Sequence, residues 1–359
     1  MAPFGVFTVN RRAILGLCSM MLVAGSSSAQ TVSGVSGTLG HGNTVTVSGS
    51  GFGTRARQTP LIWDDVESGA FNSAWTSTTH LSPTGTQSRH QFSSRCGVVN
   101  FKNYEAGGWF QGGQNDPGPW YCQYWFKLDE NFDWGNTGPT GIGSNLANVK
   151  VFRIWETGPA IEDFVVATEG WSNSLIYTAS NVSGQPSDWF EGNFKQNWTK
   201  GTWHLFQFEF KDSSMGQHDG VFRMWRDGQL VVENTALMTR EDYAAYKRPM
   251  IVGFYNSWGD ASTDDNHFYI DDALIDNSWA RVEIGNAPTY AACTHREIQI
   301  LQSWADGQVS FRVNQGSFEN ASTAYVFVKN NSGAVSTGYP ITFGGTATAG
   351  PGQPGKPTF

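Results

Sequence analysis

The sequence predicts an all-β protein. Its 359 residues include 42 glycines and only 15% charged residues, a composition that favours short strands and glycine-rich turns. Several segments alternate apolar and polar side chains, which places the two kinds on opposite faces of a strand. Only residues 239–246 are predicted to be a short helix. A threonine caps its start, its first turn is acidic, and Pro249 ends it.

The first 29 residues are predicted to be a signal peptide. Arg11 and Arg12 precede a short apolar run, and small residues before Gln30 fit a signal peptidase site. The run is too short to span a membrane. The arginine pair also resembles a twin-arginine export signal. We therefore expect a secreted or periplasmic protein, exported by the Sec or the twin-arginine route, with no transmembrane segment.

Charge and cysteine content exclude several classes of protein. The net charge of −8 argues against nucleic-acid binding. Beyond the signal peptide the chain contains Cys96, Cys122 and Cys293, with no spacing typical of a zinc site. We expect a Cys96–Cys122 disulfide. No dinucleotide or phosphate-binding motif is present, so we expect no organic cofactor.

The two ends of the chain resemble halves of one small domain. Residues 40–53 form a short strand and a Gly-x-x-Phe-Gly-like turn, and residues 304–313 form a Trp-led strand. Both resemble the IPT/TIG immunoglobulin-like family. This resemblance implies a small Ig-like β-sandwich built from residues 30–59 and 289–344, into which a second domain is inserted. The alternative is that two unrelated β-segments flank one large domain.

The intervening residues 60–288 resemble another family. Four segments carry the resemblance to the concanavalin A-like (laminin-G-like) jelly rolls of polysaccharide lyases and lectins: residues 61–69, 203–210, 219–228 and 268–273. It implies a jelly-roll β-sandwich that handles an extracellular polysaccharide, although this fold carries many functions. Residues 345–359, rich in Gly and Pro, are predicted to be a flexible tail.

Four predicted strands of this insert have one apolar face and one face of aromatic and polar side chains. Indoles among hydrogen-bonding groups suit the stacking of sugar rings, whereas the alternative is an ordinary solvent-exposed face. The residues predicted to line this face are Gln123, Trp125, Lys127, Arg153, Trp155, Gln207, Glu209, Arg223 and Trp225.

The favoured function is cleavage of a uronic-acid-containing polysaccharide by β-elimination. Residues 251–256 resemble a late strand of the jelly-roll lyases, which implies that Tyr255 is the acid/base on the concave face. Arg153, Gln207 and Arg223 are predicted to bind the carboxylate group of the sugar. The Arg-x-Glu-Leu-Arg and Gln-Ile-His strands of the alginate lyases are absent from the sequence.

Two other functions stay open. A non-catalytic carbohydrate-binding or adhesion module needs only Trp125, Trp155, Trp225 and Tyr255 for stacking, with polar neighbours to bond hydroxyl groups. A glycoside hydrolase needs two carboxylates across the scissile bond, and only Glu209 is in phase with the polar face.

A structural calcium ion is a further expectation from the resemblance. In related jelly-roll modules, a Glu of the first strand and an Asp of the closing strand bind calcium, and Glu67 and Asp272 occupy those places. The alternative is a pair of exposed acids at strand ends. We expect the Ig-like part to be a spacer or an anchor to a cell-surface or matrix component.

Overall fold

A computed structural model gives the fold. It describes residues 30–76, 78, 81–101, 110–111, 118–132, 147–156, 163–168, 175–180, 188–189, 198–240, 247–256 and 266–347. Every strand pair within this part is antiparallel, and the regular elements are strands apart from one 3₁₀ turn, η1 (Tyr290–Ala292). The all-β prediction is therefore confirmed.

The large unit is a jelly-roll sandwich of two sheets. One is eight-stranded: in spatial order β14 (Gln229–Leu237), β13 (Gly220–Arg226), β12 (Trp203–Lys211), β7 (Trp120–Leu128), β16 (Asn266–Asp276), β5 (Cys96–Phe101) and β4 (Leu81–Thr84), with β3 (Ile62–Asp64) paired to β16. The other is six-stranded: β11 (Asp188–Trp189), β10 (Leu175–Ser180), β9 (Asp163–Thr168), β8 (Ala147–Glu156), β15 (Lys247–Asn256) and β6 (Phe110–Gln111).

The small unit is a second sandwich, and both ends of the described chain contribute to it. Its five-stranded sheet has the order β19 (Ile300–Ala305), β20 (Gln308–Arg312), β2 (Thr44–Ser50), β1 (Thr31–Thr38) and β23 (Thr346–Ala347). Its four-stranded sheet has the order β18 (Arg296–Ile298), β17 (Arg281–Gly285), β21 (Thr323–Lys329) and β22 (Tyr339–Thr342). The relationship to the IPT/TIG family stays a prediction.

Each sandwich has its own hydrophobic core. In the large one, the period-two alternation of β12 turns Phe206, Phe208 and Phe210 inward, and the Phe208 ring stacks on Phe152 of the opposite sheet with centroids 4.7 Å apart. In the small one, strands from both chain ends bury Val45, Val47 and Phe311 together with residues of β17 and β21. Each core thus joins its own pair of sheets.

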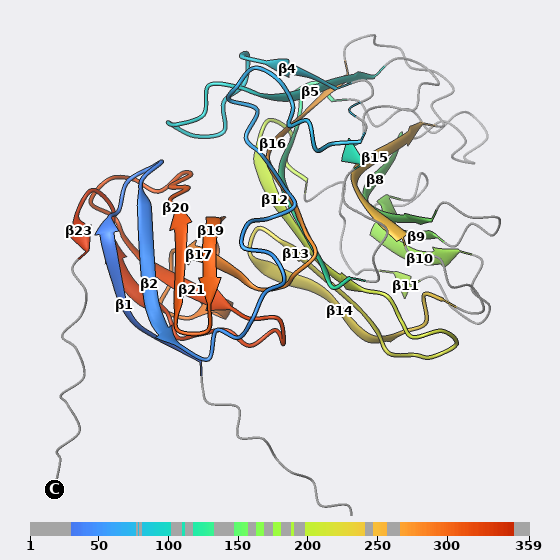
Figure 1. The fold of residues 1–359 in the computed structure, drawn as a ribbon. Coiled ribbons are helices and arrows are strands. Elements are labelled where there is room, and N and C mark those ends of the chain that lie inside the picture. The colour runs from blue at the N-terminus through green and yellow to red at the C-terminus, as the bar shows by residue number, and fades with distance from the viewer. Residues whose placement is uncertain are drawn as a thin grey trace, which may run out of the picture.

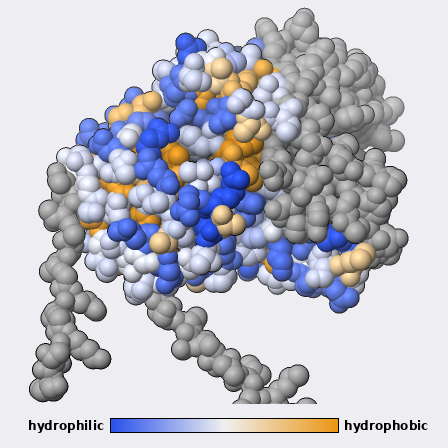
Figure 2. Space-filling view, viewed as in Figure 1, coloured by the Kyte–Doolittle hydropathy of each residue, from blue (hydrophilic) through white to orange (hydrophobic). Residues whose placement is uncertain are grey.

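The two sandwiches lie in a fixed order. Figure 1 shows the small sandwich at one side, the eight-stranded sheet in the middle and the six-stranded sheet at the far side. The eight-stranded sheet therefore has the small sandwich against its outer face. The six-stranded sheet has no such cover from the described residues. In Figure 2, apolar residues on the described surface are scattered between polar ones, and the large exposed hydrophobic side chains of this part are Met215, Leu230 and Val231.

Some sequence-based boundaries change. β17 was predicted within the jelly roll of residues 60–288, but it pairs with β21 of the small sandwich, so the large sandwich ends with β16. β23 pairs with β1, so residues 346–347 of the predicted tail 345–359 belong to the small sandwich instead. Residues 348–359, the signal peptide 1–29 and residues 241–246 of the predicted helix lie outside the described residues.

The predicted Cys96–Cys122 disulfide is wrong. In the described part of the chain, Cys96, Cys122 and Cys293 are free and buried. β16 lies between the strands that carry the first two. Two strands separated by a third are about 9.5 Å apart, beyond the reach of a disulfide.

Candidate functional site

The predicted sugar-binding residues do not share one face. Gln123, Trp125 and Lys127 lie on β7, Gln207 and Glu209 on β12, and Arg223 and Trp225 on β13, all in the eight-stranded sheet. In contrast, Arg153, Trp155 and Tyr255 lie on β8 and β15 of the six-stranded sheet. The prediction of a single concave face is therefore wrong, because the two groups belong to opposite sheets of the sandwich.

The polar face of the eight-stranded sheet is covered by the small sandwich. Gln207 is 1% exposed, Glu209 is fully buried, and Trp125 and Trp225 are each 7% exposed. The indole rings are covered by cations of the same chain: Arg89 lies 4.4 Å from the Trp125 ring centroid and Lys329 lies 4.9 Å from that of Trp225. No indole face is left there for a sugar ring.

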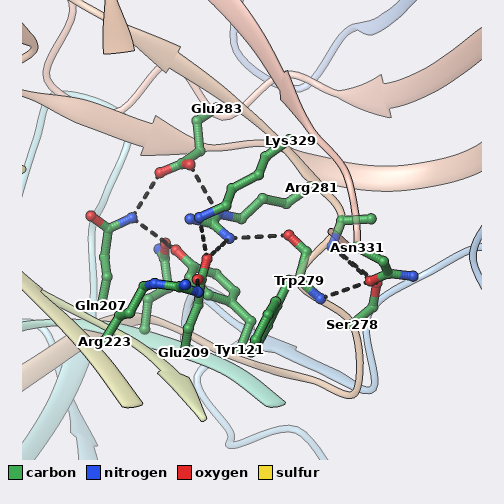
Figure 3. A network of polar contacts seen from close by, with 12 residues as sticks. Tyr121, Gln207, Glu209, Arg223, Ser278, Trp279, Arg281, Glu283, Lys329 and Asn331 are labelled. Atoms are coloured by element: carbon green, nitrogen blue, oxygen red, sulfur yellow. Dashed lines mark hydrogen bonds and ion pairs between the residues drawn. The ribbon is translucent and has the colours of Figure 1, made fainter. Parts of the chain in front are cut away.

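A network of charged side chains fills this junction (Figure 3). Glu209 accepts hydrogen bonds from Arg281 of the small sandwich at 2.7 Å, from Lys329, and from Arg223 at 3.3 Å. Each carboxylate oxygen thus has a cationic donor. The jelly roll supplies the acid, and the small sandwich supplies two of the three cations.

The neighbouring Gln207 extends the same network. Its amide donates to Glu283 at 2.7 Å and to the Tyr121 hydroxyl at 2.8 Å, and its oxygen accepts from Arg296 at 3.0 Å. Gln123 joins through Tyr121, which donates to its side-chain oxygen at 2.7 Å. The amides predicted to bind sugar hydroxyl groups therefore bind side chains of the chain itself.

The pKa values show that the network is ionised at neutral pH. Burial would raise the pKa of Glu209, but Arg281 and Lys329 outweigh it and lower that pKa. Burial is likewise outweighed at Glu283, where Arg281 and Arg296 lower the pKa to about 2. Burial, with repulsion from Arg281, lowers the pKa of Lys329 only to about 8. These groups are therefore salt-bridge partners across the junction.

Sequence reasoning missed the small-sandwich side of this network. Arg281 and Glu283 alternate with the buried Val282 and Ile284 on β17, the same period-two pattern that singled out the jelly-roll strands. Two strands with matching charged faces could have indicated a junction between sandwiches.

The remaining two residues of the eight-stranded face have local partners. Lys127 donates to the side-chain oxygen of Gln87 at 2.6 Å. Arg223 pairs with Glu209 and with Glu233 at 2.7 Å, and its guanidinium lies 5.4 Å from the Trp279 ring centroid. These contacts, like those of Gln207, occupy the groups predicted to bind substrate.

The six-stranded sheet brings Arg153, Trp155 and Tyr255 onto adjacent strands. Arg153 pairs with Met250, Trp155 with Arg248 and Tyr255 with Asn148 across β8 and β15. The Arg153 side chain is half-buried, whereas the side chains of Trp155 and Tyr255 lie outside the described part. Tyr255 is five positions from Met250, which is about 17 Å along the strand.

A bulge in β8 modifies the alternation on this sheet. Lys150 pairs with Ala167 and Phe152 with Val166, so Val151 is the extra residue, and Val151 and Phe152 are both buried. Across the other edge, Lys150 pairs with Gly253, two residues from Tyr255. Two adjacent apolar residues in an alternating strand are the sequence signal of such a bulge.

The two predicted calcium ligands line one small cavity but already have partners. Glu67 accepts from the Ser94 amide at 2.8 Å, the Ser94 hydroxyl at 2.6 Å and the Arg95 amide at 3.0 Å. Asp272 is paired with Arg89 and accepts from Asn314 at 3.1 Å. Within the described residues, no group of three or more His, Cys, Asp or Glu side chains is arranged to hold a metal ion.

Asp271, next to Asp272, is the acid with the weakest compensation in this cavity. Its carboxylate accepts from the Ser93 hydroxyl at 3.0 Å and from the backbone amide of Asp272 at 2.9 Å. Burial and the adjacent Asp272 raise its pKa well above the usual range. A cation beside it would favour the ionised form.

The structural role of the charged network around Glu209 can be tested. Glu209→Gln leaves buried cations without their counter-charge, so we expect a loss of about 3–5 kcal/mol in the free energy of unfolding. Glu233→Gln is the matched control, because it removes an exposed partner of the same Arg223, and we expect a loss of about 0.5 kcal/mol or less. Urea unfolding of both variants measures the difference, and equal losses would contradict a buried clamp at Glu209.

Comparison with known proteins adds information on the large sandwich. A family model described as polysaccharide lyase matches residues 161–273. No curated protein matches the chain. Among solved structures, the chain is similar to an endo-β-1,4-glucuronan lyase from the fungus Trichoderma reesei, with 14% identity, a TM-score of 0.44, and coverage of 62% of this chain and 97% of the other.

Two further solved structures show similar values. One is the cellulose-induced protein Cip1, with 20% identity, a TM-score of 0.40, and coverage of 60% of this chain and 97% of the other. The second is alginate lyase vAL-1 from Chlorella virus, with 11% identity, a TM-score of 0.42, and coverage of 61% of this chain and 99% of the other. The family match runs from the segment before β9 into β16, within the large sandwich. Residues 161–273 of this chain are therefore similar in sequence to the polysaccharide lyase family.

Proposed function

We propose that this protein cleaves a uronic-acid-containing polysaccharide by β-elimination on the outer face of the six-stranded sheet. The polysaccharide lyase match is the observation that carries the proposal. The small sandwich covers the other sheet of the jelly roll, and no described residue covers this one in the same way. This supports a substrate position opposite the small sandwich.

The chemistry needs a base, an acid and a cation near the sugar carboxylate. The base removes the C5 proton, a C4–C5 double bond forms, and the C4–oxygen bond breaks as the leaving oxygen takes a proton. Tyr255 is proposed as acid/base. Because the bulge shifts the alternation of β8, its positions 148 and 150 are expected to share the outer face with Arg153.

Lys150 is proposed to bind the carboxylate at the reacting sugar, since its partner Gly253 lies two residues from Tyr255. Arg153 is proposed to bind a neighbouring sugar further along the strand, beside Trp155. Gln207 and Arg223 have no part in this proposal because their polar groups are committed to the junction.

The proposed reaction can be followed by its products. With a polyuronate, the protein is expected to raise both the ultraviolet absorbance of unsaturated ends and the number of reducing ends, and Tyr255→Phe is expected to lower the rate at least about 100-fold. Tyr325→Phe, in the small sandwich, is the matched control and is expected to cleave at the normal rate.

The possible outcomes separate the candidate functions. Reducing ends without new absorbance would indicate a hydrolase. Retention on a polysaccharide without cleavage would indicate a binding module. Normal cleavage by Tyr255→Phe would leave the lyase but remove Tyr255 from its mechanism.

We also propose a structural calcium ion beside Asp271, with Glu67 and Ser93 lining the same cavity. The support is the buried carboxylate of Asp271, together with the side-chain oxygens of Glu67 and Ser93 in the same cavity, since calcium prefers oxygen ligands. Asp272 already has Arg89 as its ion-pair partner. Backbone oxygens and water would complete the coordination.

This ion predicts a pH-dependent stabilisation. Burial raises the pKa of Asp272 to about 6 and that of Asp271 well above its usual range, so stability without the ion is lost as the pH rises through these values. Calcium competes with protons, so we expect it to raise Tm more at pH 8 than at pH 5. Asp271→Asn is expected to abolish the calcium-dependent rise in Tm, whereas the control Asp219→Asn, at an exposed position, is expected to keep it. If a chelator does not lower the Tm of the wild-type protein, the proposed ion is refuted.

Export is proposed from the predicted signal peptide. Within the described residues, no helix is both long and apolar enough to cross a membrane. The mature protein is expected to begin at Gln30, and the intact mass of the protein recovered outside the cytoplasm measures this. Recovery of the chain with residues 1–29 still attached would contradict cleavage at that place. The small sandwich is proposed to face a cell-surface or matrix component.

A further inference from the structure

The two segments that connect the sandwiches are clasped to each other. Arg55, which follows β2, donates to Asp276 at the end of β16 at 2.5 Å and to the Ala280 carbonyl oxygen. The two side chains are 0% and 4% exposed. The Arg55 guanidinium also lies 5.6 Å from the Trp304 ring centroid in the small sandwich. Both crossing points of the chain are thus held in one buried contact.

A second clasp is the network around Glu209. Figure 3 shows Arg281 and Lys329 reaching from the small sandwich to this carboxylate, while Gln207 reaches the opposite way to Glu283. Donors and acceptors therefore alternate between the two sandwiches. Glu209 thus depends on the small sandwich for two of its three cationic donors.

A third clasp lies in the β4–β5 loop. The Arg89 guanidinium pairs with Asp272 of the jelly roll and donates to Glu297 of the small sandwich at 2.8 Å, and its side chain is 1% exposed. Two residues further on, Gln91 donates to the carbonyl oxygen of Phe318 at 3.3 Å. One loop of the jelly roll is therefore bonded to the small sandwich at two places.

An apolar cluster lies at the same junction. Tyr121 and Leu274 of the jelly roll pack with Trp279 and Ile298, which are all buried. The indole nitrogen of Trp279 also donates to the carbonyl oxygen of Trp120 at 2.9 Å. A junction with its own buried apolar cluster resembles an obligate interface more than a transient one.

We propose that the two sandwiches form one rigid body and unfold as one cooperative unit. Three clasps carried by different elements restrict both hinge motion and rotation, and the charges that they bury would have to be rehydrated together if the sandwiches separated. The small sandwich is thus an integral part of the protein's scaffold and not a tethered module. This inference does not depend on the proposed activity.

Hydrogen exchange of the mature protein in urea tests the proposal. In wild type, the slowest amides of both sandwiches are expected to share one free energy of opening, and fluorescence and circular dichroism are expected to give coincident unfolding curves. Two separate transitions, or a small sandwich that opens before the jelly roll, would overturn the proposal.

A pair of arginine variants sharpens the test. Arg55→Ala removes the linker clasp, and Arg57→Ala removes an exposed arginine two residues away as control. Arg55→Ala is expected to speed exchange of the slowest amides by the same factor, about tenfold or more, in β12 and in β21. Acceleration confined to one sandwich would show that the two are energetically independent.

Discussion

The buried carboxylate of Glu209 is the constraint on which the arrangement of the molecule depends. Placed in the middle of an outer sheet face, it needs cations within hydrogen-bonding distance, and Arg281 and Lys329 of the small sandwich meet that need. Docking follows from this requirement: the sheet that carries Glu209 turns toward the small sandwich, and the opposite sheet is the one proposed to bind the substrate.

The failure of the predicted site has a specific physical cause. Alternation in β7, β12 and β13 correctly separated an apolar from a polar face, and the polar face does contain Trp125 and Trp225. Exposed indole rings are unfavourable, and for this reason the sequence predicts that a sugar ring covers them. Alternation along one strand does not indicate which element covers its polar face. Here cationic side chains from distant parts of the same chain cover the two indole rings.

The parts that could be predicted are those with a local signal. Period-two patterns identified strands such as Trp203–Lys211. The resemblance of residues 40–53 and 304–313 to one Ig-like family indicated a separate small sandwich built from both ends of the chain. Non-local pairing could not be predicted in this way. The partner of Glu209 is 120 residues away at Lys329, and the placement of Arg153 and Gln207 in opposite sheets depends on strand order.

The geometry of the six-stranded sheet bears on the size of the substrate. Tyr255 lies about 17 Å along β15 from Met250, the partner of Arg153, a span much longer than one sugar ring. If both residues act on one molecule, it must be a polymer or long oligomer lying along the strands. A rigid scaffold suits this arrangement, because several sugars can be held in register only if the supporting sheet does not flex between them. The clasped junction on one side of the jelly roll would thus support the binding surface proposed on its other side.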